Sequence, residues 1–296
     1  MKKALVTGSS GFVGRHMVNH LSVRGFVVHA VDTEIDIECE TIFSESDIVY
    51  DIVVHAAARS PHRIAIDKRP DIFPYNVMLD SMMFDWAIRT KQRRVVYLSS
   101  VAVYPARLQT YAATIDAHTY GDRRLRETDA DDGRPADTYG ETKLLGEKMA
   151  AAARQCGVPV TVVRPFSGYG EDQSANFPFR AFIERARTRC DPFIVWGSSS
   201  QERDWVHIDD ICAAIMALAD AKIVRPVNIC TGVGLSMCEL ANLIWDNIPG
   251  YVPRLEVDDT APLGCAYRVG HPGLLHNYYT PKISIEEGVQ RALRED

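Results

Sequence analysis

The chain has 296 residues, which is enough for one large α/β domain or two closely joined ones with a substantial core. With a net charge of −6, 46% hydrophobic residues and 24% charged residues, it has the composition of a globular protein without a general basic field for nucleic acid. The apolar run in the N-terminal MKKALVTG is too short for a signal peptide, no segment could span a membrane, and seven scattered cysteines without a C-x-x-C spacing favour reduced thiols in a cytoplasm.

Short apolar runs alternate with helix-like segments in the first half of the chain. The predicted strands are Lys3–Thr7, Phe26–Asp32, Asp51–Ala58, Arg94–Ser100 and Val158–Pro165. The predicted helices are Phe12–Leu21, Ile72–Arg89 and Tyr139–Gln155. Continuous apolar strands separated by helices indicate βαβ units. We therefore predict an α/β fold, a Rossmann-type, doubly wound parallel sheet with helices on both faces.

The pattern is looser after Pro165. The predicted elements are a helix near Phe179–Arg189, a strand at Phe193–Trp196, a helix over Trp205–Ala219, a strand at Pro226–Cys230 and a final helix over Ser284–Glu295. Asp209 and Asp210 are expected at the start of a helix, where acidic residues are favoured. We predict a sheet domain of residues 1–165 with returning segments near 205–231. Residues 166–204 and 232–296 are expected to form a smaller, interleaved C-terminal lobe that binds the substrate.

No metal site is expected. The stretch Pro105–Pro135 is polar and irregular, and its acidic run Asp129–Asp132 is typical of a solvated loop. His16 and His20 lie four residues apart in the first predicted helix, but the sequence shows no third ligand beside them.

The segment TGSSGFVG places Gly8, Gly11 and Gly14 between the first predicted strand and the first predicted helix. Glycine lets the backbone approach a pyrophosphate, and the helix N-terminus offers free N–H groups to the phosphates. Asp32 ends the second predicted strand, where a carboxylate binds ribose hydroxyl groups and repels a 2′-phosphate. No Arg or Lys lies next to Asp32, so we predict NAD rather than NADP.

The segment DTYGETKLLGE contains Tyr139 and Lys143, four residues apart in a predicted helix. This spacing puts both side chains on one helix face, and alone it would equally describe an exposed surface pair. Together with TGSSGFVG, VVHAAA, YLSSVAVY and RDWVHIDD, it resembles the extended short-chain dehydrogenases/reductases, specifically the NAD-dependent epimerase/dehydratase group that acts on nucleotide sugars. The C-terminal PKISIEEGVQRAL is similar to the closing helix of that family, so the resemblance covers nearly the whole chain.

The resemblance implies a role for individual residues. The implied catalytic residues are Ser100, Tyr139 and Lys143. The implied cofactor-binding residues are Gly8, Ser10, Gly11, Phe12, Val13, Gly14, Asp32, Asp36, Ile37, Ala56, Ala57, Ala58, Asn76, Tyr139, Lys143 and Pro165. The implied substrate-binding residues are Ser100, Val101, Asn176, Arg203 and Arg268. Ser100 could instead cap a turn, and Arg203 could instead pair with Asp204.

The resemblance also implies a nucleotide-diphosphate sugar, UDP-, dTDP- or GDP-linked, as substrate and a homodimer as the assembly. Oxidation of a sugar hydroxyl needs a base, and an unperturbed tyrosine, with a pKa of about 10, is too weakly ionised near neutral pH. Lys143 and the positive nicotinamide of NAD⁺ would both favour phenolate at Tyr139. A shift of about three pKa units requires about 4 kcal/mol.

The choice of reaction depends on the residues after Ser100. Family dehydratases carry an Asp-Glu pair there, whereas this chain has Val101 and Ala102, which resembles the C4 epimerases and argues against a 4,6-dehydratase. We therefore predict a C4-type epimerase. A keto-sugar reductase using NAD(P)H is the alternative, because Pro105 is similar to the GDP-fucose synthase branch, which uses NADPH but has Cys in place of Val101. A non-catalytic dinucleotide sensor is disfavoured, since Ser100, Tyr139 and Lys143 are all present.

Overall fold

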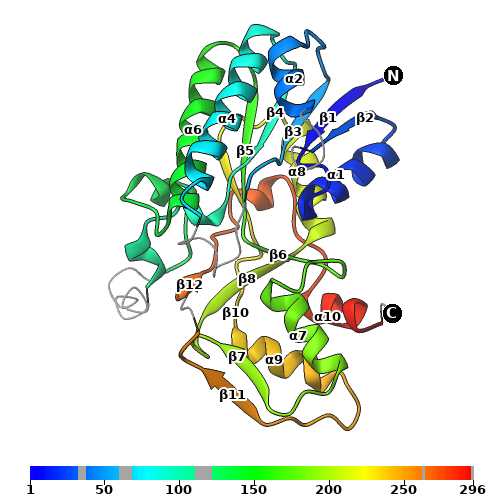
Figure 1. Cartoon of the computed structure of the whole chain (residues 1–296), viewed down its shortest axis with the longest axis vertical. Helices are drawn as coiled ribbons and strands as arrows, with labels where there is room; N and C mark the ends of the chain where they lie inside the picture. Colours follow the sequence, from blue (N-terminus) through cyan, green and yellow to red (C-terminus); the bar gives the residue numbers. More distant parts are fainter. Residues whose placement is uncertain (33–37, 60–68, 111–121, 262–263, 295–296) are drawn as a thin grey trace.

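The computed structural model describes residues 1–32, 38–59, 69–110, 122–261 and 264–294. A six-stranded parallel sheet lies at the centre of the upper part of the molecule in Figure 1, in the order β2-β1-β3-β4-β5-β9. Its strands are β1 (Lys3–Thr7), β2 (Val27–Val31), β3 (Ile52–His55), β4 (Val95–Leu98), β5 (Val160–Pro165) and β9 (Pro226–Ile229). All neighbouring strands are parallel, so their carboxyl ends meet at one edge.

Helices cover both faces of the sheet, as predicted. Helices α1 (Phe12–Val23) and α8 (Ile208–Asp220) lie on one face, and α2 (Glu38–Glu45), α4 (Ile72–Arg89) and α6 (Thr138–Gln155) lie on the other. Successive side chains of a strand point to opposite faces, so Ala4 and Val6 join the core beneath α1 and α8, while Leu5 joins the core beneath α4 and α6. The strands therefore have to be apolar throughout.

The rest of the chain forms a second layer of short strands and helices below the carboxyl edge of the sheet in Figure 1. Strand β8 (Glu202–His207) pairs with β6 (Ser167–Tyr169), β10 (Gly234–Ser236) and β12 (Tyr267–Arg268), and β7 (Phe193–Trp196) pairs with β11 (Leu255–Asp258). Helices α7 (Pro178–Arg187), α9 (Met237–Asp246) and α10 (Ile285–Arg294) contribute to a third core around Phe179, Trp205 and Leu240. The chain returns from this layer to the central sheet through β9.

The structure corrects the predicted helix over Trp205–Ala219. Its first three residues belong to β8, where Trp205, Val206 and His207 pair with β6, and α8 begins only at Ile208. Asp209 and Asp210 indicate a helix start at this point, and the pairing of Trp205–His207 with β6 makes the preceding residues a strand. Asp209 and Asp210 lie in the first turn of α8, as predicted.

The segment between the second and third strands is also informative. Helix α2 leads into β3, which is the third strand among the described residues and ends directly before Ala56. Pro105–Pro135 is irregular in its described part, except for the one-turn helices η2 (Ala106–Gln109) and η4 (Glu127–Asp131). Of the acidic run Asp129–Asp132, Asp131 and Asp132 are exposed as expected for a solvated loop, but Ala130 is buried in the core and Asp129 is half-buried.

Candidate active site

The glycine-rich turn after β1 is packed so closely that side chains would not fit. Gly8 has a φ of 69°, and a Cβ atom on it would lie 2.6 Å from the backbone nitrogen of Ala57. A Cβ atom on Gly14 would lie 1.9 Å from the carbonyl oxygen of Gly8. Gly11 precedes α1 without a side-chain cap, so the first N–H groups of the helix, from Phe12 onward, are available to an anion. The turn therefore fits the pyrophosphate of a dinucleotide.

Asp32 follows β2 and lies against the same turn. Its Oδ2 atom accepts hydrogen bonds from the backbone N–H of Ser10 (3.0 Å) and from the Ser10 hydroxyl. Val13 lies on the first turn of α1, which starts two residues beyond Ser10. A carboxylate at this place suits ribose hydroxyl groups. Asp36 and Ile37 lie outside the described residues.

The segment Ala56–Ala58 runs past the turn after the end of β3. The backbone N–H of Ala57 bonds the Thr7 hydroxyl at 3.4 Å. Asn76, buried in α4, holds the next residue, Arg59, from both sides: its Oδ1 accepts the Arg59 N–H (2.8 Å) and its Nδ2 donates to the Arg59 carbonyl (3.0 Å). Asn76 therefore fixes the path of the segment that is predicted to lie along the cofactor.

Packing of η1 (Val101–Val103) against α6 brings Ser100 and Tyr139 to one edge of the sheet. Ser100 caps η1, because its Oγ accepts the N–H of Ala102 (3.1 Å). This is the turn-capping role that the sequence left open, but it uses only the oxygen as acceptor, so the hydroxyl hydrogen can still be donated to a substrate. A Cβ atom on Gly140 would lie 2.2 Å from the carbonyl oxygen of Ala102, so η1 lies directly on the first turn of α6, beside the half-buried Tyr139.

Lys143 lies one turn further along α6, with a buried side chain. Its Nζ donates to the carbonyl of Leu98, at the end of β4 (2.8 Å), and lies 4.9 Å from the centroid of the Tyr97 ring. These two contacts stabilise an ammonium that would otherwise be costly to bury. The structure thus brings Lys143, Tyr139 and Ser100 together where β4 ends.

A buried polar chain that the sequence analysis missed lies beneath Lys143. The Tyr97 hydroxyl donates to Asp80 Oδ2 (2.5 Å), His55 Nε2 bonds Asp80 Oδ1 (3.0 Å), and His55 Nδ1 bonds the Thr7 hydroxyl (2.8 Å). Burial and the neighbouring charge of Asp80 raise the pKa of Tyr97 well above its usual value. A Cβ atom on Gly146 would lie 1.9 Å from the Tyr97 hydroxyl oxygen, so only glycine lets α6 lie on this chain. The histidine of VVHAAA was the one signal in the sequence.

A second buried network clamps α6 to β5. Arg164 makes a bidentate pair with Glu147, with Nε–Oε1 at 2.8 Å and Nη2–Oε2 at 2.6 Å. Glu147 also accepts the Ser99 hydroxyl, and Arg164 donates to the Tyr104 hydroxyl (3.2 Å) and the Glu127 carbonyl (2.8 Å). Burial alone would lower the pKa of Arg164, but the hydrogen bonds and charge of Glu147 outweigh it and raise that pKa.

Arg203 and Arg268 are register partners in the parallel pair of β8 and β12, so they share one face of the second layer. Arg203 donates to the carbonyl groups of Glu202 (2.8 Å) and Cys265 (2.6 Å). Arg268 donates to Gln109 Oε1 (2.6 Å) and to Cys265 Sγ (3.2 Å). The two guanidinium groups therefore converge on Cys265 and form a paired cationic site.

Asp204, the alternative partner of Arg203, is buried at the next position of β8. It accepts hydrogen bonds from the N–H and hydroxyl of Thr231 (2.8 and 2.7 Å) and from the N–H groups of Gly232 (2.9 Å) and Gly270 (3.2 Å). Four donors satisfy this carboxylate and join β8 to the loops after β9 and β12.

The remaining predicted residues lie at different depths. Val101 is buried in η1, next to Ser100. Pro165 ends β5 at the same edge of the sheet. Asn176 is exposed in the segment before α7, where its backbone N–H bonds the Ser174 hydroxyl at 3.3 Å. The described contacts do not join Asn176 to Arg203 or Arg268.

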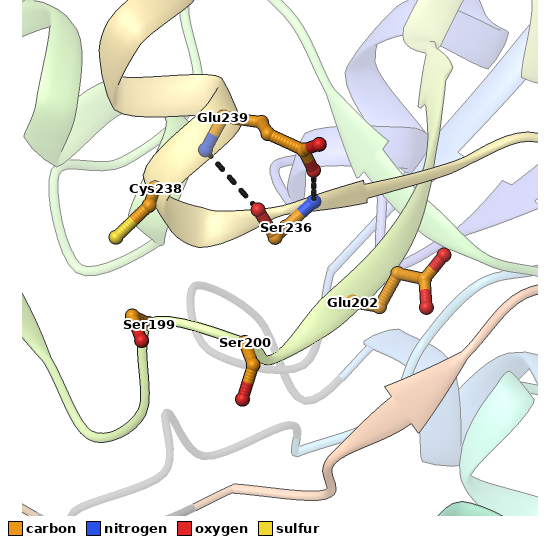
Figure 2. Close-up of a pocket in the computed structure, with 6 residues that line it drawn as sticks. All are labelled: Ser199, Ser200, Glu202, Ser236, Cys238 and Glu239. Carbon is orange, nitrogen blue, oxygen red and sulfur yellow. Dashed lines mark hydrogen bonds between the residues drawn. The ribbon is translucent and has the colours of Figure 1, made fainter. Parts of the chain in front are cut away.

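Two open hollows occur elsewhere in the described part of the chain. Figure 2 shows one of about 430 Å³ between β8, β10 and α9, lined by Ser199, Ser200, Glu202, Ser236, Cys238 and Glu239. The other, of about 470 Å³, lies where the C-terminal segment packs on α1 and α8. There the Asp210 carboxylate accepts the Tyr279 hydroxyl (2.6 Å) and the Ile283 N–H (2.8 Å). Neither hollow is lined by a predicted site residue.

The parallel sheet, its helices on both faces and the glycine-rich turn define a Rossmann-like α/β protein. Residues 4–230 match the NAD dependent epimerase/dehydratase family, and the chain belongs to that family. Within the described residues, no helix is long and apolar enough to cross a membrane. No cluster of three or more His, Cys, Asp or Glu side chains that could hold a metal occurs in the same part of the chain.

Relatives in this family differ in the reaction that their names describe. GDP-L-fucose synthase 1 of Arabidopsis thaliana is 26% identical over 307 residues, which cover 98% of this chain and 91% of that protein. dTDP-4-dehydro-6-deoxy-D-allose reductase of a Streptomyces species is 26% identical over 296 residues, which cover 90% of this chain and 87% of that protein. The structure of UDP-glucose 4-epimerase from Thermus thermophilus in complex with NAD has a TM-score of 0.79 at 22% identity and covers 98% of this chain and 97% of that one.

Proposed function

We propose that this chain is an NAD-dependent nucleotide-sugar epimerase that acts at C4, with Tyr139 as the acid/base. The observation that carries the proposal is the meeting of Ser100, Tyr139 and Lys143 where β4 ends, at the same carboxyl edge of the sheet as the glycine-rich turn. The paired guanidinium groups of Arg203 and Arg268 provide the positive charge that a diphosphate needs.

Each residue has a distinct chemical task in this proposal. When bound, NAD⁺ supplies the acceptor for the hydride at C4. Tyr139 takes the proton of the C4 hydroxyl and later returns it, with Lys143 one turn further along α6. Ser100 donates its hydroxyl hydrogen to the same substrate oxygen and orients it.

Two features support the choice of cofactor and reaction. Asp32 presents a carboxylate beside the phosphate-binding turn, which suits NAD and disfavours NADP. Val101 and Ala102 are buried and have no titratable group, so the acid and base of a 4,6-dehydratase are absent from these two positions. UDP-, dTDP- and GDP-linked sugars are the candidate substrates, since the names of the relatives include all three nucleotides.

A keto-sugar reductase is the second candidate. It is favoured by the synthase and reductase relatives, which are 26% identical over nearly the whole chain. The two reactions differ in cofactor use, because an epimerase returns its hydride whereas a reductase consumes one reduced nicotinamide for each product. A homodimer and a cytoplasmic location stay predictions. Two apolar side chains of α4, Phe73 and Met78, are exposed.

Mass spectrometry of the cofactor released from purified protein, followed by a panel of nucleotide sugars, tests the proposal. We expect NAD, isomerisation of at least one sugar, and no net change at the nicotinamide absorbance band. Tyr139→Phe should abolish turnover and retain NAD. Tyr50→Phe, at the opposite end of β3 and bonded to His29 (2.8 Å), is the matched control and should keep full activity. Unchanged turnover in Tyr139→Phe would refute the proton-transfer role.

A further inference from the structure

The buried charges around β4 balance only when Lys143 is counted together with Asp80. This part of the core holds two cationic side chains, Lys143 and Arg164, and two carboxylates, Asp80 and Glu147, and all four are buried. Arg164 and Glu147 form a direct bidentate pair. Lys143 has no carboxylate oxygen within 4.0 Å of its Nζ in the described part of the chain. The charge that compensates its ammonium therefore lies further away, and Asp80 is the unpaired candidate.

The side chain of Tyr97 lies between Lys143 and Asp80. Its ring faces the ammonium, with Lys143 Nζ 4.9 Å from the ring centroid, and its hydroxyl donates to Asp80 Oδ2 at 2.5 Å. Gly146, three residues beyond Lys143 on α6, leaves the hydroxyl the room that it needs. A phenol that donates to an anion gains negative charge on its ring, and a cation above the ring face is attracted by that charge. The carboxylate of Asp80 therefore acts on Lys143 through the ring.

The hydrogen bonds around Asp80 fit its ionised form. Thr7 Oγ1 accepts the N–H of Ala57 (3.4 Å), so its own hydrogen is free for His55 Nδ1 (2.8 Å). A neutral imidazole that accepts at Nδ1 donates at Nε2, and His55 Nε2 lies 3.0 Å from Asp80 Oδ1. Asp80 then receives one donor on each oxygen, as a carboxylate can. Burial, followed by the charge of Asp80, raises the pKa of Tyr97 and keeps its hydroxyl protonated as the second donor.

We infer that Tyr97 is a positioning residue: its ring, polarised by the carboxylate of Asp80, holds the ammonium of Lys143 in the place from which it serves the cofactor. This inference rests on the proposed function, in which Lys143 binds NAD beside Tyr139. Tyr97 is fully buried, so it acts through Lys143 and does not itself touch cofactor or substrate. Fixing a free lysine side chain costs conformational entropy, so an ammonium that the ring already holds binds the cofactor with less loss.

Fluorination of the ring at position 97 tests this inference, because fluorine withdraws charge from the ring face and changes the shape of the ring little. Tyr97→Phe supplies the starting ring, and phenylalanines with one, two and three ring fluorines then replace it. The NAD affinity measured by calorimetry should fall stepwise, by about fivefold to tenfold in total, with log Kd linear in the number of fluorines. With a nucleotide sugar that is turned over, kcat should fall in parallel and KM for the sugar should stay unchanged.

A charge variant and a matched control complete the design. Asp80→Asn keeps the size of the side chain and removes its charge, so it should weaken NAD binding by about threefold to tenfold. Tyr251 is the control, because it is a buried tyrosine of the second layer whose hydroxyl also donates at 2.5 Å, to the Cys190 carbonyl, and whose ring faces Arg189 at 5.8 Å. Tyr251→Phe and its fluorinated forms should leave NAD affinity and kcat unchanged.

The outcomes separate this inference from a structural role and from the proposed function. If NAD affinity does not follow the number of fluorines, the role of the ring is refuted even where the variants are less stable, because packing alone gives no graded response to ring charge. Calorimetry with NAD needs no sugar, so wild type that turns over no nucleotide sugar refutes the proposed function without deciding the fluorine series. If Tyr97→Phe does not fold, fluorinated tyrosine at position 97 keeps the hydroxyl, and unchanged NAD affinity in that protein refutes the inference.

Discussion

The buried pair of Glu147 and Arg164 makes a quantitative prediction about stability. The two side chains are 7% and 3% exposed and share two short hydrogen bonds. Glu147→Gln removes the negative charge and leaves a buried guanidinium unpaired, which should cost about 3–5 kcal/mol of unfolding free energy. Urea denaturation followed by tryptophan fluorescence measures the change. Turnover should also fall, because Glu147 lies one turn beyond Lys143 on α6.

A double variant distinguishes a coupled pair from two independent contacts. Glu147→Leu with Arg164→Met removes both charges, so it should lose less stability than either single variant, about 1–3 kcal/mol for the donors and acceptors left unpaired. The exposed pair of Glu287 and Arg291 is the control, and Glu287→Gln should cost at most about 1 kcal/mol. Equal losses for the buried and exposed pairs, or strict additivity in the double variant, would refute the reasoning.

Three further predictions concern the turn, the pH response and the thiols. Gly14→Ala places a methyl group against the carbonyl oxygen of Gly8, so it should cost about 1–3 kcal/mol and weaken NAD binding, as measured by denaturation with and without NAD. The hydrogen bond from His207 lowers the pKa of Glu171 below 4.5, so this pair stabilises the fold above that pH and loses its contribution as the pH falls through the lowered value. Glu171→Gln should therefore show a shallower loss of stability on acidification, and an equally steep loss would contradict this. Cys156 is exposed, so the native wild type should have one more fast-reacting thiol than Cys156→Ser when treated with a thiol reagent. After unfolding, the total number of reactive thiols in Cys156→Ser should be lower by only that one.

Local features of the sequence were sufficient for many elements of the fold. Strand β1, helix α4 and strand β7 have the predicted ends, because an apolar run or a helical period bounded by polar residues is a local property. The glycine-rich turn was also predictable, since a strand, three glycines and a helix start occur in one short segment. The boundary at Trp205–His207 was not, because these residues become a strand only by pairing with β6.

The sequence by itself determined which residues could carry the chemistry: the serine, tyrosine and lysine, the acid after the second strand, and the arginines of the second layer. Only the tertiary structure decided how those residues are supported. The hydrogen-bond chain from Tyr97 through Asp80 to His55 and the bidentate pair of Glu147 and Arg164 each join residues from different helices and strands. The physical reason is burial, which makes every polar group dependent on a partner that folding supplies from elsewhere in the chain.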